Sequence, residues 1–340
     1  MLLRIARKTL ISIVGRLPFL EALVDFLPSR KNSIKIIAYH RINNIPTSNY
    51  PFDSGLINAS CEEFEEQVKY IKRYFNPITF TDLKNLIDNN LTIPKRTILI
   101  TFDDGFEDNY TNAFKILSKH SVKATFFVSA GLMGQDELFW FERINYILRN
   151  TSESTIENID GTIIDLSENK NLSINKISET MKLFSNDKMR AYILNLEKKL
   201  GIQYNESDLN FSKTMNWEQI IEMSDAGMEI GSHSYNHPIL SRLSLEELKE
   251  ELSLSKITIE KHIGKKVISL AYPNGDDASV GKTVEEVANN TGYTFGLKYG
   301  HEGTNYFPVD NFFRMKRMGI LNRYKGEMFR LALNYPSLIL

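Results

Sequence analysis

The stretch Ile98-Leu99-Ile100-Thr101-Phe102-Asp103-Asp104-Gly105 joins an apolar, β-branched run to two adjacent carboxylates and a glycine. A run this short and apolar predicts a strand that is buried on both faces, as in a parallel sheet. The working groups of such folds lie at the carboxyl ends of the strands. Neighbouring side chains at a strand end point in different directions, so Asp103 and Asp104 can serve different purposes. Taken alone, however, the stretch is more typical of a strand followed by an ordinary Asp-Gly turn.

A second stretch gives the aspartate pair a chemical context. Gly231-Ser232-His233-Ser234-Tyr235-Asn236-His237-Pro238 follows a short predicted strand and carries two of the 6 histidines of the chain, four residues apart. Two imidazoles and one carboxylate form a ligand set that suits a divalent metal such as zinc and leaves positions open for water and substrate. The single cysteine, Cys61, excludes a cysteine-based metal site and an intramolecular disulfide.

Together, the two stretches resemble the metal-dependent polysaccharide deacetylase (NodB-homology) family. The family motif Thr-Phe-Asp-Asp-Gly is matched in full by residues 101–105, and the motif His-Ser/Thr-x-x-His-Pro by residues 233–238. The resemblance implies an incomplete, distorted (β/α)7 barrel. It also implies a hydrolase that removes N-acetyl groups from amino sugars in a polysaccharide or lipid-linked glycan and releases acetate.

The resemblance further assigns roles to matching residues. Asp104, His233 and His237 are expected to bind a divalent ion, zinc first and cobalt, nickel or manganese as alternatives. Asp103 is expected to act as the general base on a water molecule whose pKa the metal lowers. The backbone N–H of Tyr272, in the turn Leu270-Ala271-Tyr272-Pro273-Asn274-Gly275, is the expected donor to the oxyanion.

The sequence departs from the best-known family pattern in three places. Ala271 stands where the third motif usually carries an arginine, and both the tryptophan of the fourth motif and the late Leu-x-x-His motif are absent. An early Tyr-His dipeptide and the Ala-Tyr-Pro-x-Gly turn resemble the exopolysaccharide-type branch, whose motif order is permuted. In a closed barrel the first and last strands are neighbours, so a catalytic group can arrive on either.

Permutation makes His40 the candidate general acid, with His301 in reserve, and Arg317 the candidate for the missing guanidinium near Asp103. Each assignment has a simpler alternative. His40 could be a buried histidine that only hydrogen-bonds at a strand end, and Arg317 could form an ordinary surface salt bridge.

The 340-residue chain alternates about seven strand-like segments with helices, which predicts an α/β barrel or a doubly wound sheet. Residues 31–323 are expected to form the barrel, with a mainly helical insertion at about 138–215, and 324–340 to form a tail or helix. The charge is nearly balanced, with 41 basic and 42 acidic residues, so nothing in it predicts a nucleic-acid partner. The oligomeric state is left open.

Residues 1–30 are cationic and apolar, and their spacing predicts an amphipathic helix. Peripheral contact with an anionic membrane, packing on the protein's own surface and a secretory signal are the three interpretations. No apolar run approaches the ~20 residues that span a bilayer. We expect a cytoplasmic protein, peripheral at the inner membrane face if the helix binds lipid, with export as the alternative.

Two other functions compete with deacetylation of an N-acetylated glycan. One is hydrolysis of another non-peptide amide or imide bond by the same metal centre, and the other is glycan binding without catalysis. The presence of Asp103 weighs against the second, because a binding protein has no need of the general base.

Overall fold

The computed structural model describes residues 32–45 and 50–335. The predicted amphipathic segment 1–30 lies outside this part of the chain, so its membrane contact and the cytoplasmic location stay predictions. Within the described residues, no helix is both long and apolar enough to cross a membrane.

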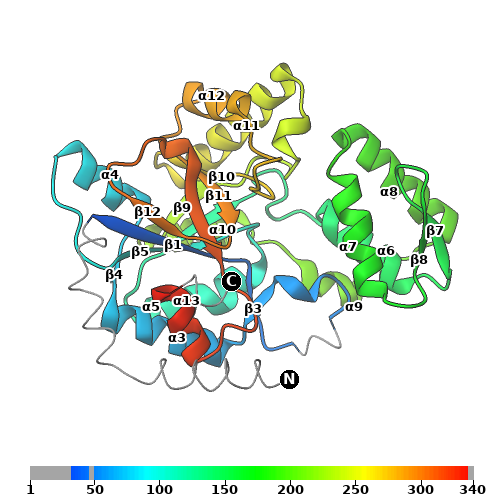
Figure 1. Cartoon of the computed structure of the whole chain (residues 1–340), viewed down its shortest axis with the longest axis horizontal. Helices are drawn as coiled ribbons and strands as arrows, with labels where there is room; N and C mark the ends of the chain where they lie inside the picture. Colours follow the sequence, from blue (N-terminus) through cyan, green and yellow to red (C-terminus); the bar gives the residue numbers. More distant parts are fainter. Residues whose placement is uncertain (1–31, 46–49, 336–340) are drawn as a thin grey trace.

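Seven parallel strands of the described chain close into a barrel, as Figure 1 shows. Around the ring, each strand pairs with the next and the last returns to the first. The predicted (β/α) barrel is therefore confirmed, and its first and last strands are neighbours: Ile37 of one pairs with Met318 of the other. In ring order the strands are β1 (Ser33–Tyr39), β5 (Thr97–Phe102), β6 (Thr125–Val128), β9 (Glu229–Ser232), β10 (Ser269–Ala271), β11 (Phe295–Gly300) and β13 (Met315–Gly319).

The apolar runs seen in the sequence become these strands because the barrel buries them on both faces; all six residues of β5 are buried. The last strand, β13, begins only after the 3₁₀ turn Phe312–Arg314. Four short strands lie at the rim. β4 (Asn76–Pro77) extends the sheet beside β5, β12 (Thr304–Tyr306) pairs antiparallel with β1, and β2 (Arg41–Ile42) pairs with β3 (Ile57–Ala59).

Helices surround the barrel (Figure 1). A capping box formed by Ser60 and Glu63 opens the first of them. The helical segment after β5 starts as a π-helix, Asn109–Phe114, and only then becomes α-helical. The helices outside the insertion lobe are α3 (Cys61–Tyr74), α4 (Phe80–Asp88), α5 (Lys115–Lys119), α9 (Glu206–Leu209), α10 (Trp217–Asp225), α11 (Leu245–Ile263), α12 (Lys282–Asn290) and α13 (Glu327–Asn334), with short 3₁₀ turns at Ser54–Leu56, Asn210–Ser212, Leu240–Arg242 and Phe312–Arg314.

The insertion forms a lobe beside the barrel, drawn in green at the right of Figure 1. It holds a hydrophobic cluster of its own, to which α6, β7, β8, α7 and α8 contribute. It also contains a β-hairpin, with Ile156 opposite Ile164. The limits predicted for the barrel (31–323) and the insertion (138–215) stay predictions. The lobe consists of α6 (Trp140–Asn150), β7 (Thr155–Glu157), β8 (Ile163–Asp165), α7 (Lys170–Met181) and α8 (Asn186–Leu200).

Candidate metal centre and active site

The predicted site residues gather at the carboxyl ends of three barrel strands. Asp103 and Asp104 follow β5, His233 follows β9, and His40 follows β1. All four line one cavity of about 270 Å³, and His237 joins them from the loop after β9. The barrel thus brings together residues that are far apart in the sequence, at the edge where catalytic groups of such folds lie.

Among the described residues, one group of His, Cys, Asp or Glu side chains could hold a metal ion. It consists of Asp104, His233 and His237. The Oδ1 atom of Asp104 lies 3.4 Å from Nε2 of His233 and 3.3 Å from Nε2 of His237. These separations are long for hydrogen bonds. They match ligands around one tetrahedral zinc, because bonds of about 2.0–2.1 Å place neighbouring ligand atoms about 3.3 Å apart.

Further features of the three residues fit a metal ion. All three are buried, and Oδ2 of Asp104 and Nδ1 of His237 have no hydrogen-bond partner among the described residues. Nδ1 of His233 lies 2.8 Å from the carbonyl oxygen of Ala271. If Nδ1 carries the proton and donates it there, Nε2 is left free to bind a metal, the usual arrangement for a histidine ligand.

Burial and charge set the protonation of these ligands in opposite directions. Burial raises the pKa of Asp104, but the imidazoles of His233 and His237 outweigh it and hold the pKa well below the ordinary value. Burial lowers the pKa of His233, but the two aspartates outweigh it and leave the pKa raised. For His237 burial prevails and the pKa is lowered. The carboxylate is therefore ionised and His237 is readily neutral, whereas His233 would have to release a proton when a metal binds, because a metal site needs both imidazoles neutral.

Three residues of the site have a left-handed backbone conformation, two of them in the loop 233–238 that carries both histidines. Asp104, Ser234 and His237 have φ values of +73°, +64° and +56°, which cost about 1–3 kcal/mol each for residues other than glycine. The backbone N–H of His237 donates to Oγ of Ser234 at 3.0 Å, and the N–H groups of residues 235–236 donate to Glu251 at 2.8 and 2.6 Å. These contacts fix the loop and so the positions of the ligands.

Asp103 is paired with Arg317, as the sequence predicted for the missing guanidinium. Two nitrogens of Arg317 donate to the two carboxylate oxygens at 2.6 and 2.8 Å, and both side chains are buried. Arg317 also donates to Oγ of Thr101 at 3.2 Å. Burial raises the pKa of Asp103, but Arg317 and then His233 outweigh it and hold the pKa below the ordinary value. Asp103 is therefore an ionised carboxylate beside the three candidate ligands.

We expect Arg317→Met to destabilise the protein by about 3–5 kcal/mol at neutral pH, because the variant leaves the carboxylate of Asp103 buried without its cation. In the wild type the pair stabilises the fold above the unfolded-state pKa of Asp103, and this contribution is lost as the pH falls through the lower folded-state pKa. The loss in free energy of unfolding should therefore be smaller at acidic pH. Urea unfolding at several pH values measures it.

Arg314→Met is the matched control for this experiment. Arg314 forms a partly exposed ion pair with Glu285 at 2.6 Å, and such pairs contribute only about 0–1 kcal/mol. Equal losses in free energy of unfolding for the two variants would mean that burial does not make the ion pair of Arg317 and Asp103 more important for stability than the exposed pair.

His40 is fixed through its backbone while its ring faces the cavity. Its N–H donates to Oδ1 of Asn58 at 2.5 Å, and its carbonyl oxygen accepts from Nδ2 of Asn109 at 2.7 Å. The ring packs edge-on to Tyr299, with centroids 5.5 Å apart, and its Nδ1 is buried with no partner in the described chain. These backbone hydrogen bonds at the end of β1 fit the simpler alternative, and the role of the ring as general acid stays a prediction.

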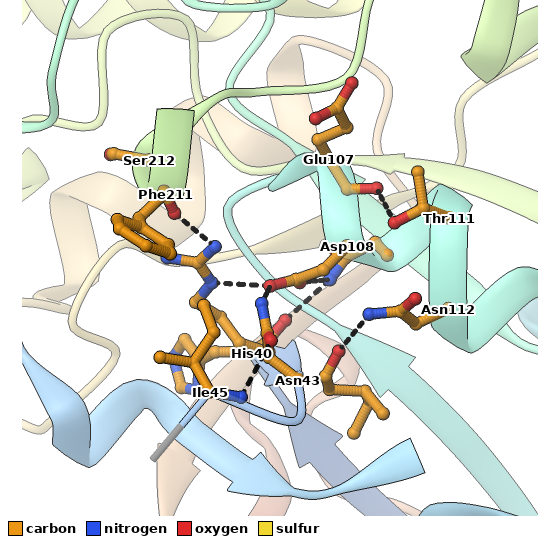
Figure 2. Close-up of polar contacts among 12 residues, drawn as sticks. His40, Asn43, Ile45, Glu107, Asp108, Thr111, Asn112, Phe211 and Ser212 are labelled. Atoms are coloured by element: carbon orange, nitrogen blue, oxygen red, sulfur yellow. Dashed lines mark hydrogen bonds and ion pairs between the residues drawn. The ribbon is translucent and has the colours of Figure 1, made fainter. Parts of the chain in front are cut away.

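A buried ionic network beside His40 was not predicted. Nε of Arg41 donates to Oδ2 of Asp108 at 2.8 Å, and Nδ2 of Asn43 donates to the same oxygen at 3.2 Å, as Figure 2 shows. Arg41 also donates to the carbonyl oxygen of Phe211 at 2.5 Å and lies 3.8 Å from a carboxylate oxygen of Glu142 in α6. The network therefore ties the end of β1 to the insertion. The only sequence signal was that Arg41 follows the predicted acid.

The structure argues against the predicted role of Tyr272. Its backbone N–H, the expected oxyanion donor, already donates to the carbonyl oxygen of Leu297 at 3.1 Å, and its hydroxyl donates to Phe313 at 3.1 Å. A donor paired with the neighbouring strand is not free for substrate. Two residues on, Asn274 also lines the cavity, and its N–H has no acceptor among the described residues.

The reserve candidate His301 lies on an exposed loop after β11 and is not part of the cavity wall. Among the predicted residues, the structure thus brings Asp103, Asp104, His233, His237, His40 and Tyr272 to one cavity, with Arg317 behind Asp103.

The chain is similar to known proteins in sequence and in fold. The model of a family described as polysaccharide deacetylase matches residues 90–158 and 174–296, more than half of the chain. A poly-beta-1,6-N-acetyl-D-glucosamine N-deacetylase of Staphylococcus aureus is 27% identical over 180 residues, which cover 49% of this chain and 61% of that protein. The match thus spans about three fifths of the length of this relative.

Two solved structures share the fold. The Streptococcus pyogenes deacetylase PplD, in complex with acetate, has a TM-score of 0.60 at 19% identity, with 89% of this chain and 99% of that chain covered. IcaB from Ammonifex degensii has a TM-score of 0.56 at 18% identity, with 89% and 98% covered. At this identity the likeness shows the fold.

Proposed function

Because the chain belongs to the polysaccharide deacetylase family, we propose that it is a metal-dependent hydrolase that removes N-acetyl groups from the amino sugars of a polysaccharide or lipid-linked glycan. The observation that carries the proposal is the buried triad of Asp104, His233 and His237 beside the ion pair of Asp103 and Arg317. The name of the S. aureus relative supports a polymer of β-1,6-linked N-acetylglucosamine as the first substrate to test.

In this proposal Asp104, His233 and His237 hold the ion, zinc first and cobalt, nickel or manganese as alternatives. The bound ion would polarise the acetyl carbonyl and lower the pKa of a water molecule beside it. Asp103 does not need to bind the ion. Kept ionised by Arg317, it accepts a proton from the attacking water as general base.

The remaining steps fall to His40 and to a backbone donor. The water oxygen bonds to the carbonyl carbon, and we assign stabilisation of the oxyanion to the N–H of Asn274 in place of that of Tyr272. The C–N bond then breaks, and the sugar nitrogen leaves as an amine after taking a proton from His40. The products are acetate and a free amino sugar.

We expect His40→Ala to lower kcat by about 10²–10⁴ while the metal stays bound, because an unprotonated amide nitrogen is a very poor leaving group. His301→Ala is the matched control, since its side chain lies outside the cavity. Acetate release and metal content measure the two effects. Near-normal turnover for His40→Ala with collapse for His301→Ala would transfer the role to His301.

A substrate panel separates this proposal from its competitors. Metal-loaded protein is incubated with β-1,6-linked N-acetylglucosamine polymer, with lipid-linked N-acetylated glycan and with cyclic imides and simple amides, and product amine and acid are measured. Acetate from a glycan supports deacetylation. Hydrolysis of the imides or simple amides alone would favour another C–N bond, and binding of glycan without any product would favour a non-catalytic protein.

A further inference from the structure

One polar stripe of the insertion lines the same cavity as the metal centre. It consists of Asn175, Ser178, Glu179 and Lys182, at the end of α7. Their spacing of i, i+3, i+4 and i+7 places the four side chains on one face of the helix. The apolar residues Ile174, Ile177 and Met181 pack into the core of the insertion instead. The stripe therefore faces the cavity because the other face of α7 is buried.

An aromatic wall of the same cavity adjoins the metal ligands. Trp140 and Phe141, at the start of α6, both line the cavity. The ring of Phe141 lies edge-on to that of His237, with centroids 5.3 Å apart, and Trp140 lies 5.8 Å from Phe141. Thus the insertion contributes an apolar surface next to the ligands as well as the polar stripe on α7.

The end of α7 is held against the barrel. Nε of Arg242, in the turn Leu240–Arg242 of the barrel, donates to the carbonyl oxygen of Lys182 at 3.2 Å. The buried network of Arg41, Asp108 and Glu142 ties α6 to the end of β1. Because both helices are fastened to the barrel, the distance between stripe and metal centre is set by the fold.

The chemistry of the stripe indicates an uncharged, hydroxyl-rich ligand. The side chains of Asn175 and Ser178 make no hydrogen bond within the described chain, and both can donate and accept. Nζ of Lys182 lies 2.6 Å from a carboxylate oxygen of Glu179, so the two charges largely cancel. Amide and hydroxyl groups beside aromatic rings suit a molecule with hydroxyl groups and apolar C–H faces, which describes a pyranose ring.

We propose that the α7 stripe, together with Trp140 and Phe141, forms a subsite for a second sugar residue, adjoining the one whose acetyl group is removed. This inference rests on the proposed deacetylase function. It makes the insertion the element by which the protein selects a neutral glycan chain over a single N-acetylated sugar.

The test compares the double variant Asn175→Ala/Ser178→Ala with Lys176→Ala, an exposed residue of the same helix outside the cavity. The substrates are the β-1,6-linked tetrasaccharide of N-acetylglucosamine and 4-nitrophenyl acetate, a small ester that carries no sugar residue. Loss of two hydrogen bonds of about 0.5–1.5 kcal/mol each should raise KM for the tetrasaccharide roughly 10-fold. The kcat value should be retained, and Lys176→Ala should behave as the wild type.

Hydrolysis of the small ester checks that the metal centre of each variant is intact. An unchanged KM for the tetrasaccharide, an equal rise in Lys176→Ala, or a parallel loss on the ester would each overturn the subsite. If the wild type hydrolyses the ester but not the tetrasaccharide, the proposed function fails. Calorimetric titration of the tetrasaccharide into the metal-loaded protein then tests the subsite alone, with roughly 10-fold weaker binding expected for the double variant and equal binding contradicting it.

Discussion

Asp103→Asn is expected to abolish turnover while leaving the metal content near that of the wild type. The asparagine keeps the shape of the side chain but accepts no proton from water, and general-base catalysis of this kind contributes about 10²–10⁴ in rate. The metal should stay because the triad of Asp104, His233 and His237 is complete without Asp103. Acetate release and elemental analysis of the purified variant measure the two quantities.

The fold of this variant has to be checked, since Arg317 loses its anionic partner. Circular dichroism and the melting temperature serve as controls, because a buried charge without a partner is destabilising. If Asp103→Asn folds normally but loses its metal, Asp103 shares the ligand role and the division between the two aspartates is wrong.

His233→Ala and His237→Ala are each expected to lower zinc affinity by at least about 10²-fold, more than the 10–100-fold typical of residues that only support a ligand. Removal of either imidazole leaves two protein ligands, too few for the catalytic sites that zinc forms with three. Competition with a chromogenic chelator measures the affinity. Turnover should be lost in parallel, because the water molecule then keeps its ordinary pKa.

His262→Ala is the control for these two variants. His262 is an exposed residue at the end of α11, stacked on Trp217 at 3.9 Å, so its removal should leave zinc affinity unchanged. Tight, stoichiometric zinc in His233→Ala or in His237→Ala would refute the model of three protein ligands.

The permuted order of the catalytic groups finds a simple structural basis. The polysaccharide deacetylase family model matches residues between 90 and 296, whereas His40 and Arg317 lie on either side of that range. In the closed barrel β1 lies between β13 and β5. His40 and Arg317 therefore reach the aspartates of β5 from the neighbouring first and last strands.

The sequence was sufficient where local pattern determines the structure. The apolar run 98–102 predicted a strand buried on both faces, and the motifs at 101–105 and 233–238 predicted which side chains would meet. The position of Arg317 followed from the closure of a barrel, which makes its last strand a neighbour of its first. These features depend on composition, on short spacing and on a known topology.

Other features depend on register and packing that no local pattern specifies. Tyr272 appeared available as a donor because the pairing of its N–H with Leu297 depends on how β10 and β11 align. Asn112 donates to the carbonyl oxygen of Ile42 at 2.8 Å within the segment that became π-helical. Its partner lies 70 residues away, and π-helical turns are frequent at functional sites.

The network of Arg41, Asp108 and Glu142 could not be predicted from the sequence either, because it joins three separate segments of the chain. The α7 stripe could be read as an ordinary solvated face until packing showed which side of the helix is buried. The proposed sugar subsite therefore depends on how the insertion packs against the barrel, which the linear sequence does not display.

The proposed function requires a metal ion held by Asp104, His233 and His237 for removal of acetyl groups from a glycan. The most direct measurement is acetate release from β-1,6-linked N-acetylglucosamine polymer by chelator-treated protein, before and after titration with zinc. We predict no release from the metal-free protein and full recovery at one zinc per chain. Release that is unaffected by chelation, or no release at any zinc content or with cobalt, nickel or manganese, would contradict the account.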